Sequence, residues 1–536
     1  MIERILYNGN IITQDEKEKR ASAVAISNGR IIAVGMDDDI LELATAGTKK
    51  ENLEGQTIIP GLIDAHLHWQ WTARSLTEVD VFEVPDKQVA VQRVAERVAM
   101  VVPGEWITGH GWSQAFWKDD SFPSAADLDP ISPNNPVYLR AKSGHAIWVN
   151  TAALQVTGVT ANTPDPEGGH IGRDESGNPT GILFENAIDL IFSKIPHPSV
   201  EEISMQMKAA QKLALASGLT GFHDFDGPVC FQALQLMRER GELALRVVKN
   251  INDPHIKHAH ALGIRWGFGD DWIRIGGLKI FADGALGPRT ALMVDHYEGE
   301  PDNYGIRVTD KEDMLQWVKT ATLAGMPSTI HAIGDLAVRD VLDVYEAVRK
   351  VEAAHGIKPE QRRHRIEHVQ IIHPADKHRL AELKIIASMQ PIHATSDYIM
   401  ADKHWGARSE LAYNPRLQLD QGVMVAFGSD SPIDPFDPIP NIYAAVTRRR
   451  TDGTPNEAGW YPQNKITVAE ALRGFTIGAA YAAGTEDRQG KIAPGYLADL
   501  VVLDQDIFKI PADELLETKV MATMVGGKWR YEGVMS

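Results

Sequence analysis

"SVEEISMQMKAAQKLALASGLTGFHDFD", residues 199–226, holds in one stretch the unit from which the fold is predicted. Apolar residues recur at helical spacing behind Ser199 and Glu202, which together match a capping box. Gly218 is expected to end this helix, and a short apolar strand then runs into His223. The stretch therefore reads as an amphipathic helix, a glycine stop, a buried strand and a polar strand end.

The same unit returns twice further along the chain. In 309–335, Thr309 and Glu312 are expected to cap a helix, Gly325 to stop it, and the next strand to end at a histidine. Residues 420–430, "DQGVMVAFGSD", repeat the glycine, the apolar strand and a terminal aspartate. Regular alternation of helix and strand predicts a parallel sheet.

Eight strands can be counted in this way. Five more candidates join the three of the repeats: 57–68, 245–251, 273–283, 364–370 and 384–390. Eight alternating units favour an α/β fold of the (β/α)₈ type, a TIM-like barrel. An open doubly wound sheet is the competitor, but no G-x-G-x-x-G follows any predicted strand.

Both ends of the chain have a different, β-rich pattern. Asn8-Gly9 and Asn28-Gly29 each stand between apolar runs, as in tight hairpins, and 495–533 is similarly rich in strand formers. We expect one small β-sandwich domain built from both termini, with the barrel inserted between them. The predicted boundaries of the three parts are listed here: 1–56 and 480–536 for the β-sandwich, 57–70 and 215–479 for the barrel, and 71–214 for an insertion.

The predicted insertion follows the first barrel strand and is too long for a single crossover. The region from the end of that strand holds six of the twelve tryptophans: Trp69, Trp71, Trp106, Trp112, Trp117 and Trp148. Most of them are expected to fill the core of the insertion. Because the function of a barrel lies on its βα loops, some are expected to line a pocket over the barrel mouth.

Composition narrows the class of protein. The 536 residues carry a formal net charge of −18, which argues against non-specific binding to nucleic acids or anionic membranes. Cys230 is the one cysteine, so an intrachain disulfide is excluded, as suits a reducing compartment. The N-terminus has no apolar core of signal-peptide length, and no stretch reaches the roughly 18 apolar residues of a membrane helix. A cytoplasmic protein with a small-molecule substrate is expected.

Candidate metal ligands stand at the predicted strand ends. His66 and His68 in "PGLIDAHLH" are two residues apart, so their side chains point to the same side, about 6–7 Å apart. Alone this pair is a weak signal. His331, His368 and Asp430 occupy other strand ends, and a parallel barrel gathers all such ends on one face. Imidazole and carboxylate suit zinc and similar divalent ions.

Lys279 is out of place in the apolar stretch "IGGLKIFADGALG". A buried ammonium is costly, so pairing with Asp283 or extension to solvent is one reading. The other is a lysine on the metal face. An ammonium cannot bind a cation, whereas a lysine carbamylated by CO₂ is an anionic carboxylate that can bridge two ions.

At these residues the chain resembles the amidohydrolase superfamily of metal-dependent hydrolases. The likeness lies in "PGLIDAHLH", a lysine on the fourth predicted strand, histidines on the fifth and sixth, and "GSD" after the eighth. "GWSQAFW", "SGHAIWVN", "HAIGDLAV" and "HRIEH" are similar to amidohydrolase family 3, whose members include N-substituted formamide deformylase. The likeness covers essentially the whole chain. It indicates a family and not a substrate.

The resemblance implies a divalent metal, expected to be zinc, with one or two ions per chain. The implied ligands are, in chain order, His66, His68, Lys279, His331, His368 and Asp430. His66, His68 and Asp430 would hold the more buried ion, and His331 and His368 the second. Lys279, as an N6-carboxylysine, would bridge the two ions together with a hydroxide. Because all six are present, two ions are favoured. Glu367 and Asp335 are expected to orient ligand histidines.

The implied reaction is hydrolysis of a C–N amide-type bond, as in an N-formyl or N-acyl amine. Hydroxide activated at the metal would attack, with Asp430 as general base and then acid. "GSDSP" does not match G-x-S-x-G, which argues against a serine hydrolase. The expected substrate contacts are His145, His223, Arg289 and Trp112, whereas His110, His170 and His393 have no distinctive spacing and are left out.

Two other readings stay open. One is a deaminase or cyclic-amide hydrolase of the same superfamily. The other is a catalytically silent binding or regulatory protein on the same fold, although the ligand set is intact. The family resemblance also leaves a homodimer open.

Overall fold

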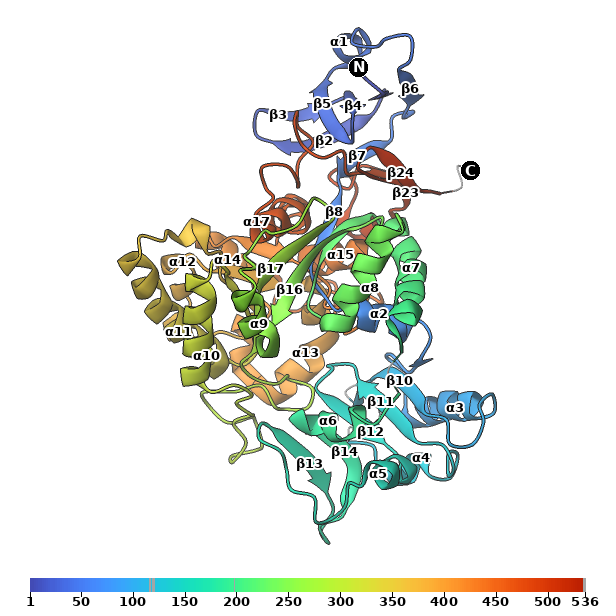
Figure 1. Cartoon of the computed structure of the whole chain (residues 1–536), viewed down its shortest axis with the longest axis vertical. Helices are drawn as coiled ribbons and strands as arrows, with labels where there is room; N and C mark the ends of the chain where they lie inside the picture. The colour runs from blue at the N-terminus through green and yellow to red at the C-terminus, as the bar shows by residue number, and fades with distance from the viewer. Residues whose placement is uncertain (115–116, 118–120, 197, 534–536) are drawn as a thin grey trace.

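A sheet of eight parallel strands forms the centre of the molecule. The computed structural model describes residues 1–114, 117, 121–196 and 198–533 (Figure 1). The eight strands, in chain order, are β8 (Leu62–Leu67), β15 (Leu219–Asp224), β16 (Arg246–Asn252), β17 (Ile273–Phe281), β18 (Ser328–Ala332), β19 (Arg365–His368), β20 (Ile386–Met389) and β21 (Val425–Phe427). They neighbour one another in this same order. This is the arrangement of a (β/α)₈ barrel.

Backbone hydrogen bonds bring the first and last strands together. The N–H of Asp430 donates to the carbonyl of His66 (2.7 Å), and the N–H of His68 donates to the carbonyl of Ser431 (2.9 Å). The sheet is thereby nearly closed just beyond the carboxyl ends of β8 and β21. The predicted parallel barrel is confirmed.

Helices surround the barrel sheet and bury its outer face. The main ones are α7 (Val200–Ala216), α8 (Pro228–Glu239), α9 (Ile256–Ala261), α10 (Lys311–Leu323), α11 (Asp335–Ala354), α12 (Arg379–Glu382), α13 (Pro391–Trp405), α14 (Pro415–Asp420) and α15 (Pro438–Thr447). Strand and helix residues share one large apolar cluster, including Met207, Leu234 and Val341. The barrel therefore rests on a continuous hydrophobic core.

The predicted helix caps met with different outcomes. The Ser199–Glu202 capping box is confirmed, since the Glu202 carboxylate accepts from Ser199 N (2.8 Å) and Ser199 Oγ accepts from Glu202 N (3.2 Å). The predicted cap at Thr309 is wrong. Helix α10 has Asp310 at its N-cap, and Thr309 Oγ1 donates instead to the carbonyl of Phe281 (2.6 Å). That contact fastens the loop to a barrel strand.

The stretch predicted as one strand over 57–68 is divided at Gly61. Before it, β7 (Thr57–Pro60) belongs to a terminal sheet, and after it β8 enters the barrel. The Gly61 N–H donates to the carbonyl of Asp499 (2.8 Å), a residue close to the other end of the chain. A Cβ on Gly61 would come within 2.4 Å of Thr220 Oγ1. This crossing therefore requires glycine.

Two sheets are built from strands near both termini. Their strands are β1 (Arg4–Tyr7), β2 (Asn10–Asp15), β3 (Glu18–Ala21), β4 (Ala23–Ser27), β5 (Arg30–Gly35), β6 (Lys49–Asn52), β7, β22 (Leu500–Leu503), β23 (Val520–Val525) and β24 (Lys528–Glu532). One sheet has the order β5-β4-β1-β6 and the other β24-β23-β22-β7-β2-β3. Apolar side chains of both, such as Val24 and Leu500, share a cluster. In Figure 1 these strands lie together at the top, blue beside red.

Only one of the two predicted Asn-Gly hairpins is present. Asn28 and Gly29 have φ of 50° and 70° and join the antiparallel strands β4 and β5. At Asn8-Gly9 the hairpin prediction is wrong, because β1 and β2 lie in different sheets. There the turn passes the chain from one sheet to the other.

Between β8 and β15 the chain forms a third sheet beyond the barrel mouth. Its strands are β9 (Val79–Asp80), β10 (Ile107–Trp112), β11 (Val137–Ala141), β12 (Ala146–Val149), β13 (Gly169–Arg173) and β14 (Pro179–Glu185). The helices beside them are α2 (Trp69–Ser75), α3 (Lys87–Val98), α4 (Ala125–Leu128), α5 (Thr151–Thr157) and α6 (Asp189–Phe192). Trp112, Trp117 and Trp148 share its apolar core. In Figure 1 this sheet lies at the end opposite the terminal strands.

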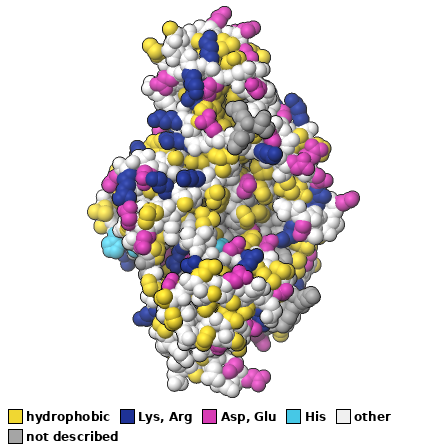
Figure 2. Space-filling model, turned by 90° about the vertical axis from the view of Figure 1, so that its right-hand side faces the viewer, with side chains coloured by type: hydrophobic (Ala, Val, Ile, Leu, Met, Phe, Trp, Pro, Cys, Tyr) yellow, Lys and Arg dark blue, Asp and Glu magenta, His cyan; other side chains and the backbone are white. Residues whose placement is uncertain are grey.

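The surface carries mixed charge on the face shown in Figure 2. There Lys and Arg side chains are interspersed with Asp and Glu and with apolar groups. Among the described residues, no helix has the length and apolar character required to cross a membrane.

Candidate metal centre

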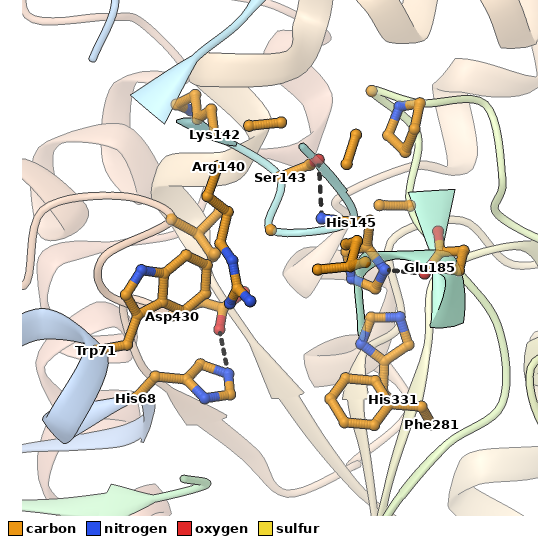
Figure 3. A pocket seen from close by; sticks show the side chains of 18 of the residues that line it. His68, Trp71, Arg140, Lys142, Ser143, His145, Glu185, Phe281, His331 and Asp430 are labelled. Atoms are coloured by element: carbon orange, nitrogen blue, oxygen red, sulfur yellow. Dashed lines mark hydrogen bonds and ion pairs between the residues drawn. The ribbon is translucent and has the colours of Figure 1, made fainter. Parts of the chain in front are cut away.

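A cavity of about 650 Å³ lies between the carboxyl ends of the barrel strands and the sheet of 79–185 (Figure 3). All six residues predicted as metal ligands line it: His66, His68, Lys279, His331, His368 and Asp430. They come from strands or strand ends far apart in sequence. The barrel topology therefore gathers them on one floor.

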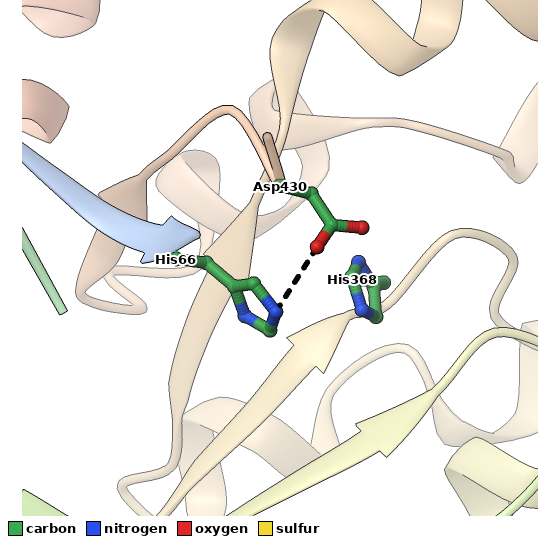
Figure 4. A group of neighbouring side chains, drawn as sticks. All are labelled: His66, His368 and Asp430. Atoms are coloured by element: carbon green, nitrogen blue, oxygen red, sulfur yellow. Dashed lines mark ion pairs between the residues drawn. The ribbon is translucent and has the colours of Figure 1, made fainter. Parts of the chain in front are cut away.

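Three of the six form a tight group (Figure 4). One ligand atom each from His66, His368 and Asp430 lies within 4.8 Å of the other two. His66 Nε2 is 3.3 Å from Asp430 Oδ1, and His68 Nε2 is 3.6 Å from the same oxygen. The prediction had assigned His368 to the second ion, whereas the structure places it beside His66 and Asp430.

In three of the four floor histidines, the Nδ1 nitrogen lies against an oxygen acceptor. The pairs are His66 Nδ1 with Glu367 (2.6 Å), His68 Nδ1 with Asp226 (3.0 Å) and His368 Nδ1 with Gln390 (2.8 Å). A carboxylate or amide oxygen accepts, so each Nδ1 carries the proton and each Nε2 keeps its lone pair. Such partners fix the ring and its tautomer for metal binding.

These orienting residues were only partly foreseen. Glu367 takes the position expected of it. Asp335 does not, because its carboxylate accepts from the backbone N–H of Val294 (2.8 Å). Asp226 and Gln390 were missed. Asp226 also accepts from the backbone N–H of Gln70 (2.6 Å), so it fixes the start of the helix that follows His68.

His331 uses its nitrogens in the opposite way. Its Nε2 donates to the carbonyl of Gly284 (3.0 Å), so the lone pair is on Nδ1. Its ring centroid lies 4.7 Å from that of His368. His331 thus stands next to the three-residue group without belonging to it.

Lys279 is buried and has no hydrogen-bond partner at Nζ. The ammonium lies over the rings of Phe281 (4.2 Å) and Phe225 (4.8 Å). Pairing with Asp283 is not what the structure shows, because Asp283 accepts from the backbone N–H groups of Leu292, Ile333 and Gly334. Burial lowers the pKa of Lys279 to about 8, which increases the share of neutral amine near neutral pH.

Asp430 is bracketed by histidines. Its Oδ2 lies 3.5 Å from Nε2 of His393, whose Nδ1 donates to Asp434 (2.7 Å). Burial alone raises the pKa of Asp430, but the neighbouring histidines, His66 first and then His393 and His368, hold it well below its usual range. The carboxylate is therefore ionised near neutral pH.

His393, which was left out of the candidate set, lies beside Asp430. It lies in α13, one turn past the seventh barrel strand, and lines the cavity. A signal was available in "MQPIH", a polar residue just after a predicted strand. The sequence could not show that helix α13 turns this ring back to Asp430.

The backbone at two of the candidate ligands is unusual. His368 and Asp430 have φ of 75° and 60°, a region that costs non-glycine residues about 1–3 kcal/mol. Asp64 braces this region, since its carboxylate accepts from Ser429 Oγ (2.5 Å), Ser429 N (3.1 Å) and His66 N (3.0 Å). The two motifs "DAH" and "GSD" are thus joined directly. Strain held by such bracing is typical of a functional site.

The four predicted substrate contacts divide into two pairs. Among the described residues, Trp112 and His145 line the cavity, whereas His223 and Arg289 do not. His223 lies inside the barrel, where Arg365 Nη1 is 2.9 Å from its Nδ1. Arg289 Nε is 2.9 Å from Glu300. We therefore propose no substrate contact for His223 or Arg289.

The residues of the floor fit a divalent cation. His66 Nε2 and Lys279 Nζ are both buried without a hydrogen-bond partner. Such orphaned atoms are rare in proteins unless a ligand or a functional role accounts for them. Imidazole nitrogens and a carboxylate are the donors that zinc and related ions take.

A family comparison agrees with this geometry. The model of the amidohydrolase family matches residues 50–531. The chain belongs to the amidohydrolase family. As an amidohydrolase, it is a hydrolase of carbon–nitrogen bonds.

Relatives of this amidohydrolase match it over nearly their full lengths. Protein LONG AFTER FAR-RED 3 of Arabidopsis thaliana is 34% identical, with 98% of this chain and 91% of the relative covered. N-substituted formamide deformylase of Arthrobacter pascens is 32% identical, with 99% of each covered. An uncharacterized metal-dependent hydrolase from Pyrococcus horikoshii is 27% identical, with a TM-score of 0.76 over 95% of this chain and 99% of that one.

Proposed function

We propose that this amidohydrolase uses a divalent metal ion to hydrolyse the amide-type C–N bond of an N-formyl or N-acyl amine. The observation that carries the proposal is the convergence of His66, His368 and Asp430, with the unpartnered Nε2 of His66 directed at the carboxylate. The relatives named as a deformylase and a metal-dependent hydrolase support the same chemistry.

The ion would be held by His66, His368 and Asp430, with His68, Lys279 and His331 as neighbouring candidate ligands. Zinc is the proposed ion, because three protein ligands with an open position are typical of catalytic zinc. When bound, such an ion supplies Lewis acidity, which polarises a carbonyl and makes hydroxide available near neutral pH.

We also propose that Lys279 becomes an N6-carboxylysine. Its neutral amine would add to CO₂ and release one proton, which gives a carboxylate suited to a second ion. The burial of Nζ and the absence of a counter-ion within hydrogen-bond reach support this reaction, since both favour the neutral amine over the ammonium.

Asp430 would move the proton during hydrolysis. As an ionised carboxylate it can accept a proton from the attacking water and deliver it to the departing nitrogen. His393 would keep Oδ2 in place by hydrogen bonding while Oδ1 faces His66. The cavity above would exclude bulk water from this exchange.

The test is metal analysis combined with a screen of N-formyl and N-acyl amines. We expect at least one ion per folded chain, loss of turnover after chelation, and recovery on adding zinc. Asp430→Asn should abolish turnover with the fold retained by circular dichroism. A folded, metal-free sample that keeps full activity would contradict the proposal. Ammonia as the product would instead indicate a deaminase.

A further inference from the structure

We propose that Arg140 is a carboxylate-binding residue and that the substrates are N-formyl or N-acyl α-amino acids. This inference rests on the proposed function, since it names the class of amide that the same site would take. Arg140 lies in β11, on the wall opposite the barrel floor, and lines the cavity. Figure 3 shows its side chain directed down into the cavity.

Aromatic neighbours and a hydroxyl hold the Arg140 guanidinium in place. Nε donates to the hydroxyl of Tyr138 (3.1 Å), and the group lies 4.4 Å from the ring centroid of Trp71 and 5.6 Å from that of Phe192. Among the described residues, no carboxylate is within 4.0 Å of it. Aromatic stacking therefore fixes the plane of the fork and leaves both terminal nitrogens available.

The other permanently charged groups of this wall already have partners. Arg74 pairs with Glu78 (2.5 Å), and Lys142 pairs with Asp434 (2.9 Å). Arg140 is thus the one guanidinium of the described cavity lining without a carboxylate partner. One unpaired charge matches the single charge of a carboxylate. A phosphate dianion would need more cations than this wall offers.

The position of Arg140 also suits the reaction. Trp71 stacks on the guanidinium, and its ring centroid lies 5.8 Å from that of His68 on the floor. A single indole therefore contacts both the guanidinium and a candidate metal ligand. These two distances place the guanidinium carbon no more than about 10 Å from the His68 ring. An amide bond at the floor and an α-carboxylate at Arg140 can be bound together.

Part of the cavity lining is apolar. Trp112, Phe122, Ile188 and Leu286 line the cavity and offer a surface for an aliphatic or aromatic amino-acid side chain. The guanidinium fork matches the two oxygens of a carboxylate in a bidentate contact.

The test compares N-formyl-L-phenylalanine with N-formyl-phenethylamine, which lacks only the carboxylate, using the zinc-loaded full chain. We expect kcat/KM to be about 100-fold higher for the carboxylate, the factor that charge-assisted hydrogen bonds of a bidentate pair contribute. Arg140→Met should remove this preference by lowering kcat/KM for N-formyl-L-phenylalanine about 100-fold. Arg74→Met, a matched control on the same wall, should leave the ratio between the two substrates intact.

A binding measurement separates this inference from the proposed reaction. N-methylsulfonyl-phenylalanine cannot be hydrolysed as an amide, and calorimetry should show about 100-fold weaker binding to Arg140→Met than to the wild type. If neither formamide is hydrolysed but this loss is seen, the reaction is wrong and the carboxylate subsite stands. Equal turnover of both formamides by the wild type would overturn the inference. So would a preference that survives Arg140→Met.

Discussion

Replacing Glu367 by glutamine tests whether the site depends on the support behind His66. The carboxylate is fully buried and accepts from Arg365 through Nε (2.5 Å) and Nη2 (2.7 Å), and from His66 Nδ1 (2.6 Å). Burial raises the pKa of Glu367, but the charge of Arg365 and the hydrogen bond from His66 lower it well below its usual range. The group is therefore an anion with three donors directed at it.

Glu367→Gln removes this charge and turns an amide N–H₂ toward one of the donors. Arg365, only 2% exposed, is then left without its counter-ion. Breaking a buried pair in this way costs about 3–5 kcal/mol of unfolding free energy. Loss of the acceptor that orients a ligand histidine should also weaken metal binding by about 10–100-fold.

Glu352→Gln provides a matched control. Glu352 is also buried, accepts from Arg349 (2.6 Å) and lies 2.9 Å from His364 Nε2, but these partners are not candidate metal ligands. Urea denaturation of the metal-free proteins should show comparable destabilisation of both variants. Zinc titration should show weaker binding only for Glu367→Gln. Equal zinc affinity in Glu367→Gln and the wild type would refute the supporting role of Glu367.

Three further perturbations give separate tests. Lys279→Met removes a buried ammonium without a hydrogen-bond partner, so the unfolding free energy should be unchanged or about 1–3 kcal/mol higher, while turnover should be lost. A clearly lower unfolding free energy of the variant in urea denaturation would contradict this. Burial lowers the pKa of His393, but hydrogen bonds to two aspartates raise it to about 9, above the ordinary 6.5. The protonated form therefore stabilises the metal-free fold fully below pH 6.5, and about 3 kcal/mol of unfolding free energy should be lost as the pH rises through 9. If the unfolding free energy of His393→Gln falls equally over this pH range, His393 is not the cause. Asp499→Asn breaks the buried bidentate contact with Arg246 (2.6 and 2.9 Å) and should lower the unfolding free energy in urea denaturation by about 3–5 kcal/mol. Zinc affinity should not change, and weaker zinc binding would show that the contact is not purely structural.

The alternation of helices and strands was sufficient to predict the barrel. Helical periodicity, glycine stops and apolar runs are local properties, and eight such units in a row leave few arrangements that bury every apolar face. Hairpin turns were less certain. Asn28-Gly29 closes a hairpin, whereas Asn8-Gly9, with the same local chemistry, connects two sheets. Pairing partners are decided by packing, which a dipeptide does not encode.

The sequence by itself determined which residue types stand at the carboxyl ends of the strands, and hence the six candidate ligands on the cavity floor. Only the tertiary structure decided how they are grouped and supported. His368 lies with His66 and Asp430, while Asp226, Gln390 and His393 come from separate elements to hold the ligand side chains. It also decided that Arg74 and Lys142 have carboxylate partners and Arg140 does not. The physical reason is that strand position follows from local pattern, whereas the pairing of charges depends on side chains brought together from distant parts of the chain.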